Sequence, residues 1–157
     1  VLSHFKSRRG SCSENKEVSI VQGDCYSVRL RSSQLITDYL KDDEGTIMLL
    51  GDLNAYSQES AILWFESNGY ENAKYTKAYK QKEVYSYGYD GMLGNLDHAL
   101  LNAKAKERVL SILDWHINSE APSLFELRVN QNETSNNILR NSDHDLILIE
   151  LRSNLSD

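Results

Sequence analysis

An apolar run over residues 46–50 stops abruptly at Gly51-Asp52-Leu53-Asn54. A continuous apolar run of this length is typical of a strand that is covered on both faces. Side chains along a strand alternate between its faces, so Asp52 and Asn54 are expected to project to the same side. Such a pair suits a hard divalent cation or a phosphate ester, and it suits an ordinary strand-ending turn equally well. The rest of the chain has to decide between these interpretations.

Strand and helix patterns are mixed along the remaining sequence. The spacing of apolar residues predicts helices over residues 26–41 and 57–67. Strands are expected at residues 1–5, 84–87, 96–101, 109–117 and 146–151, with a turn at 88–94 and an exposed loop at 122–141. This mixture indicates an α/β or α+β sandwich, and 157 residues are enough for one domain with a substantial core.

The charge balance limits how this chain could hold nucleic acid. The net charge is −6, which argues against binding by bulk electrostatics. A metal-dependent enzyme acting on phosphates stays open, because bound cations supply positive charge locally. The sequence contains no apolar run long enough to cross a bilayer.

The two cysteines, Cys12 and Cys25, lie in one polar stretch. Pairing them would close a loop of about 14 residues and contribute about 3 kcal/mol in the chain-entropy model. The alternative is a pair of unrelated thiols in a cytosolic protein. We favour the disulfide, and with it an oxidising compartment.

Polar side chains with catalytic potential follow or precede four of the expected strands. They are His4, Asp52 with Asn54, Asp97 with His98, and Asp143-His144-Asp145. Each also has a plainer interpretation as a half-buried histidine, a turn cap or a strand start. If the four edges share one end of a sandwich, the set matches the needs of phosphodiester hydrolysis: carboxylates for a metal, a base for water, and donors for phosphoryl oxygens.

Five segments carry a resemblance to a known family. They are "VLSHFKS", "LLGDLNAY", "YSYGYDGMLGNLDHALL", "DWHINSEAP" and "SDHDLILIEL". In this order they resemble the endonuclease/exonuclease/phosphatase superfamily, and most of all its bacterial extracellular nuclease branch. The resemblance runs through the whole chain. It implies a DNase I-like fold, a four-layer sandwich of two sheets with outer helices, and a nuclease that uses a divalent cation, Mg²⁺ first and otherwise Mn²⁺ or Ca²⁺.

The resemblance also implies roles for single residues. Asp52 and Asn54 are expected to hold the attacking water and contact the scissile phosphate, with a metal close to Asp52. Asp143 is expected as a metal ligand, and His144 as the histidine at the phosphate. Asp97 resembles the carboxylate that orients this histidine, and His4 is similar to an upstream phosphate-binding histidine. Lys6 and one of the two residues Arg29 and Arg31 are expected to contact the substrate backbone, and the spacing leaves the choice between the two arginines open.

The chain departs from the family pattern at its start. Family members begin with strands that carry an asparagine and a metal-binding glutamate, and both precede the "HFKS" strand with which this chain opens. Residues 1–157 therefore resemble the C-terminal portion of a single domain. We expect little activity from this portion alone. We also expect an exposed apolar face that pairs with the missing half of the domain or with a second copy.

Two questions remain open at this stage. Tyr75, Tyr79, Tyr85, Tyr87 and Tyr89 could stack on unpaired bases beside Lys77, Lys80 and Lys82, or could pack their rings on the sheet. The leading interpretation of the chain is a secreted, extracellular or periplasmic nuclease, with DNA as the first choice of substrate. The alternatives are a phosphoesterase for a phospholipid or inositol phosphate, and a non-catalytic binding module that keeps the fold.

Overall fold

The computed structural model describes residues 1–10, 12, 20–121 and 142–153. These residues form an α+β structure, as the sequence predicts. Its helices are α1 (Tyr26–Leu40), α2 (Ser60–Ser67), the 3₁₀ turn η1 (Ala73–Tyr75) and α3 (Ala103–Arg108). Its strands are β1 (Met48–Asp52), β2 (Glu71–Asn72), β3 (Tyr87–Tyr89), β4 (Met92–Gly94), β5 (Asp97–Leu101), β6 (Val109–Trp115) and β7 (Leu146–Leu151).

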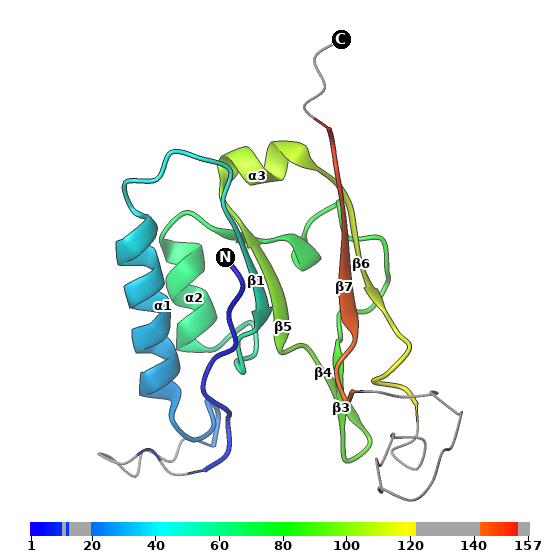
Figure 1. Cartoon of the computed structure of the whole chain (residues 1–157). Helices are drawn as coiled ribbons and strands as arrows, with labels where there is room; N and C mark the ends of the chain where they lie inside the picture. The colour runs from blue at the N-terminus through cyan, green and yellow to red at the C-terminus, as the bar shows by residue number, and fades with distance from the viewer. Residues whose placement is uncertain (11, 13–19, 122–141, 154–157) are drawn as a thin grey trace, which may run out of the picture.

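The central sheet has the order β1-β5-β2 and is antiparallel. The N-terminal segment runs beside β1 (Figure 1), where the Ser3 amide donates to the Leu50 carbonyl at 2.9 Å and the Phe5 amide to the Asp52 carbonyl at 2.9 Å. Gly51 permits this approach: a Cβ there would lie 2.0 Å from the Ser3 carbonyl oxygen, and its φ of +137° favours glycine. The segment thus lies against the end of β1 that carries Asp52.

Both faces of β1 and β5 are buried, which confirms the interpretation of the apolar run. On one face, Leu49 and Leu100 pack with Ile62 and Phe65 of α2 in a core that also reaches α1. The opposite face packs against the β6–β7 hairpin, through Ile112 and its neighbours. Figure 1 shows the resulting layers: the two helices, the central sheet, and the hairpin. Two packed cores therefore hold the central strands in place.

The longer predicted elements are found close to their expected places, and the shortest ones are not. The predicted turn at 88–94 is a hairpin of β3 and β4 around Asp90-Gly91, and residues 1–5 form a single bridge at Leu2 rather than a regular strand. The sequence patterns also missed β2, η1 and α3. The loop expected at 122–141 lies outside the described residues.

The outer face of the β6–β7 hairpin carries exposed apolar side chains. The paired residues Trp115 and Leu146 are 50% and 51% exposed, and Leu148, opposite Leu113, is 45% exposed. The expectation that such a face pairs with the missing half of the domain or with a second copy stays a prediction. Among the described residues, no helix combines the length and the apolar character needed to span a membrane.

Candidate active site

Strand pairing brings the first two carboxylates together. Asp52 ends β1, Asp97 begins β5, and the antiparallel register sets them directly opposite each other. His144, just before β7, joins them through a bridge to Tyr87 of β3. A cavity of about 480 Å³ at this end of the sheets is lined by six of the predicted residues: His4, Asp52, Asn54, Asp97, Asp143 and His144. Segments far apart in the sequence therefore meet at one patch.

His144 is held by Asp97. Its Nδ1 lies 2.7 Å from Asp97 Oδ2, which also accepts a 2.6 Å hydrogen bond from Ser86 Oγ. The imidazole ring packs at a tilt on Tyr87, with 4.7 Å between ring centroids. Burial lowers the pKa of His144, but the hydrogen bond to Asp97 and the charges of Asp97, Asp52 and Asp143 outweigh it, so the pKa is raised. Because Nδ1 donates to Asp97, Nε2 is the nitrogen that faces the cavity.

Asp52 is oriented by the turn that follows it. The Asn54 amide donates to Asp52 Oδ1 at 2.8 Å, and Asn54 Nδ2 donates to Oδ2 at 3.1 Å. Asn54 adopts φ 47°, a left-handed conformation that asparagine tolerates better than most residues, and its Nδ2 also reaches the Phe5 carbonyl at 3.2 Å. Burial raises the pKa of Asp52 and the charge of Asp97 adds to this, against the hydrogen bond from Asn54. In this arrangement Asn54 positions Asp52.

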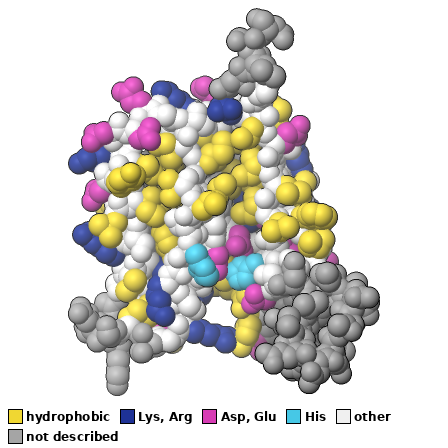
Figure 2. All heavy atoms as spheres, in the orientation of Figure 1, with side chains coloured by type: hydrophobic (Ala, Val, Ile, Leu, Met, Phe, Trp, Pro, Cys, Tyr) yellow, Lys and Arg dark blue, Asp and Glu magenta, His cyan; other side chains and the backbone are white. Residues whose placement is uncertain are grey.

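Two histidines face the same carboxylate oxygen. His4 Nε2 lies 3.4 Å from Asp52 Oδ2, and His144 Nε2 lies 3.9 Å from it. His4 is exposed, so it is free to contact a ligand in the cavity. Figure 2 shows histidine side chains on either side of an acidic patch near the middle of this face, with basic side chains below them.

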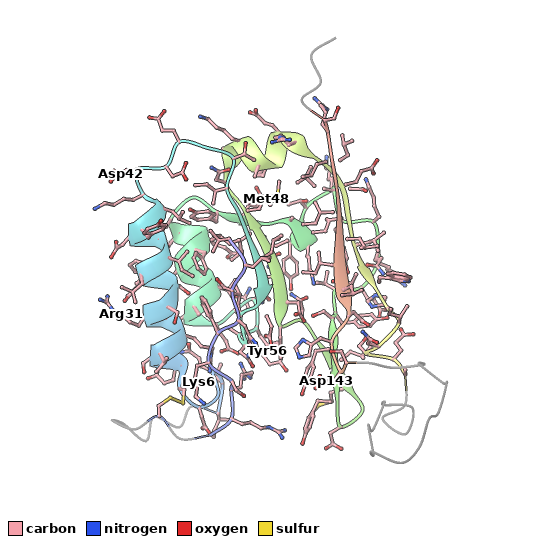
Figure 3. All side chains as sticks on the ribbon, in the orientation of Figure 1. Lys6, Arg31, Asp42, Met48, Tyr56 and Asp143 are labelled. Carbon is pink, nitrogen blue, oxygen red and sulfur yellow. A yellow bond between two sulfur atoms is a disulfide. The ribbon has the colours of Figure 1, made fainter. Side chains whose placement is uncertain are left out.

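The carboxylates at this patch fit a hard divalent cation by their chemistry. Oxygen and nitrogen atoms of Asp52, Asp97 and His144 lie within 4.8 Å of one another. Asp97 is already engaged by His144 and Ser86, whereas the exposed carboxylate of Asp143 lines the same cavity (Figure 3). Hard cations such as Mg²⁺ prefer carboxylate oxygens. Within the group that the geometry brings together, Asp52 is therefore the residue best suited to hold one, and the metal role expected of Asp143 stays a prediction.

The basic residues expected to contact substrate are not brought to the cavity. Arg29 is fully buried and donates to the carbonyls of Asp24 at 2.7 Å and Lys6 at 3.3 Å, so its expected contact with substrate is wrong. Arg31 lies on α1, away from Asp143 (Figure 3). Lys6 is exposed on the segment that carries His4, but the described lining of the cavity does not include it.

Two neighbours of the predicted residues serve the fold instead. His98 is fully buried, with Nε2 at 2.8 Å from the Ala55 carbonyl, and burial lowers its pKa to about 4. Asp145 is also buried and accepts hydrogen bonds from the Asn118 and Ser119 amides at 3.0 and 2.9 Å. Burial acts to raise the pKa of Asp145, but hydrogen bonds from His116, Ser119 and Asn118 outweigh it and lower the pKa.

No family model matches this chain, and no curated protein matches it. Among solved structures, the chain is similar to the crystal structure of a functionally unknown conserved protein from Enterococcus faecalis, with a TM-score of 0.53 and 15% sequence identity. The match covers 81% of this chain and 45% of the other, so the chain spans less than half the length of that neighbour. At this identity the likeness shows a shared fold alone.

Sequence reasoning missed several residues that shape the site. Ser7 and Ser142 line the cavity, Ser86 anchors Asp97, and Tyr87 supports the His144 ring. Tyr87 is one of the tyrosines considered for stacking. Ser7, Ser86 and Ser142 lie in segments that carry the family resemblance, but their roles are not predictable from it, because these roles depend on the pairing of distant segments.

Proposed function

We propose that the chain belongs to a secreted, divalent-metal-dependent nuclease that hydrolyses phosphodiester bonds. The observation that carries this proposal is the Asp97–His144 pair facing Asp52 across one cavity. The resemblance of five ordered sequence segments to the endonuclease/exonuclease/phosphatase superfamily supports it.

Asp52, His144 and His4 have different roles in in-line hydrolysis. Asp52 accepts a proton from the attacking water, and burial helps by raising its pKa toward that of a general base. The water oxygen bonds to phosphorus while the bond to the leaving oxygen breaks. His144, whose charged form is favoured by Asp97, stabilises the phosphoryl oxygens through Nε2–H or gives its proton to the leaving oxygen. His4 contacts a further phosphoryl oxygen.

Asp52 and Asp143 would hold the divalent cation, with Mg²⁺ as the first choice. A cation bound there would polarise a phosphoryl oxygen and favour deprotonation of the attacking water. It would also offset the negative charge of the carboxylates, so that an acidic protein can accept a phosphodiester.

The disulfide between Cys12 and Cys25, predicted from the sequence, is present in the structure. Disulfides persist in oxidising compartments. This supports an extracellular or periplasmic nuclease, for which nucleic acid from the surroundings, DNA first, would be the substrate.

The proposal is tested on plasmid DNA with the native protein that contains this chain, with Mg²⁺ and with chelator. We expect the Asp143→Ala/His144→Ala variant to lose activity by roughly 10²–10⁴-fold, the usual contribution of acid–base groups. Asp42→Asn is the matched control, because Asp42 lies at the far end of α1 from Asp143 (Figure 3). Degradation by the double variant at the parent rate would show that the site is wrongly assigned.

A further inference from the structure

A second pocket, of about 270 Å³, adjoins the catalytic cavity. Three segments form its walls: the N-terminal segment with Arg8 and Arg9, the turn after β1 with Tyr56, and the β3–β4 hairpin with Tyr89. Leu96, which is buried, also lines it. The proposed chemistry at Asp52 and His144 does not use this pocket.

Two guanidinium groups of the pocket lie over aromatic rings, but Arg8 is also paired with the buried carboxylate of Glu59, so Arg9 is the cation that a ligand meets. The Arg9 guanidinium carbon lies 4.1 Å from the centroid of the Tyr89 ring, and that of Arg8 lies 4.5 Å from the Tyr56 ring. Tyr87 and Tyr89 point to the same side of β3, and their rings are parallel within 5° at 6.3 Å between centroids. Tyr89 is 46% exposed and Arg9 is exposed, so a ligand can reach both.

The pocket and the cavity share residues. Ser7, Asn54, Tyr87 and Leu96 line both. Tyr87 contacts the His144 ring and also lies next to the Tyr89 ring. A ligand whose phosphate lies at His144 would therefore place the group next to that phosphate in the pocket.

Flat rings beside the exposed Arg9 suit a planar, electron-rich group attached to an anion. Nucleobases stack on aromatic side chains and on arginine. The volume lies just below the range of about 300–1,000 Å³ that is usual for drug-sized ligands, which suits one base rather than a base pair. A cationic lipid headgroup would be repelled by Arg9, whereas the charge of Arg8 is already balanced by Glu59.

We infer that this pocket binds the unpaired base next to the scissile phosphodiester, so that the enzyme prefers single-stranded or locally unpaired nucleic acid. The inference rests on the proposed function, and it adds that the preferred nucleic acid is single-stranded or locally unpaired. A base must leave its partner to enter the pocket, which favours strands that are already unpaired.

The test measures binding without chemistry, by fluorescence anisotropy of a labelled oligonucleotide in chelator, with the native protein. We expect Tyr89→Ala to weaken single-strand binding by about tenfold, the usual effect of losing one stacked base, and to change binding of the matched duplex much less. Tyr89→Phe keeps the ring and should bind single strands like the parent. Tyr39→Ala is the control, because Tyr39 is 86% exposed on α1.

A second pair of variants tests the cation. Arg9→Ala should weaken single-strand binding more than Arg31→Ala, although both remove one exposed positive charge. Unchanged single-strand binding in Tyr89→Ala, or an equal loss for single strand and duplex, would refute the base pocket. The proposed nuclease activity would survive that result, because its own test depends on Asp143 and His144.

Discussion

At the scale of single residues, the charge of His144 depends on what surrounds its ring. Asp97 accepts from Nδ1, Asp52 lies 3.9 Å from Nε2, and both favour the imidazolium. Burial opposes them and does not prevail, since the pKa of His144 is raised. The imidazolium–carboxylate pair therefore stabilises the fold below the ordinary histidine pKa, and this contribution is lost as the pH rises through the raised value.

Replacing Asp97 by asparagine should lower the pKa of His144. Burial still disfavours the charged imidazole in this variant, and one of the carboxylates that favour the charged form is gone. The measurement is an NMR titration of the His144 ring protons in chelator, for the parent and for Asp97→Asn. The buried His98, whose pKa is lowered to about 4, should stay neutral across the neutral range in both proteins. A His144 titration that is the same in both proteins would contradict the role given to Asp97.

Sequence patterns could find the residues of the site that pair across strands, and could not find those whose role depends on burial. Asp52 and Asp97 sit at strand ends, and alternation with antiparallel register then brings them together. The burial of Arg29 is not predictable from the residues that surround it in the sequence, because the chain segment that covers its side chain includes the distant Lys6. Its hydrogen bonds to the carbonyls of Lys6 and Asp24 are visible only in three dimensions.

At the scale of elements, a buried ion pair joins η1 to β6. Lys74 Nζ lies 2.6 Å from Asp114 Oδ1 and donates to Asn95 Oδ1 at 2.7 Å, while the Tyr79 hydroxyl donates to Asp114 Oδ2 at 2.8 Å. Lys74 and Asp114 are each 1% exposed. Burial lowers the pKa of Lys74, against the attraction of Asp114. The pair therefore links the central sheet to the hairpin through charge.

Lys74→Ala should destabilise the protein by about 3–5 kcal/mol, because it leaves the Asp114 carboxylate buried without its countercharge and with only the hydrogen bond from the Tyr79 hydroxyl on its side-chain oxygens. Lys106→Ala is the matched control: Lys106 pairs with Glu71 at the surface, where both side chains are about half exposed, and such pairs contribute about 0–1 kcal/mol. Both free energies of unfolding come from urea titration. Equal, small losses in the two variants would show that the buried pair does not link the layers.

The elements that sequence patterns missed are the shortest ones. β2 has two residues, η1 has three and α3 has six, too few for a period of two or of 3.6 to stand out. Asn102 caps α3 by accepting from the Ala105 amide at 2.9 Å, a signal that the sequence does contain. The apolar run of β1 fits packing on both faces, whereas β7 is just as apolar although one of its faces is exposed.

At the scale of the whole molecule, the N-terminal segment connects the two pockets. It places His4 at the cavity that Asp52 and Asp97 line, and Arg8 and Arg9 at the second pocket. Arg29 holds the segment by its carbonyls, and the Cys12–Cys25 disulfide ties the chain just beyond it to the start of α1. The α+β class was predictable from patterning, whereas the contacts that hold the N-terminal segment are visible only in the structure.

Removing the disulfide should loosen this segment and affect both stability and binding. Cys12→Ser/Cys25→Ser opens a loop with a sequence separation of 13, and the chain-entropy model gives a loss of about 3 kcal/mol for a loop of this size. Thermal unfolding should therefore show a lower Tm, and single-strand binding should weaken because Arg8 and Arg9 are less well placed. Reductant should lower the Tm of the parent in the same way and leave the double variant unchanged. A Tm that is equal for parent and variant without reductant would contradict this role of the disulfide.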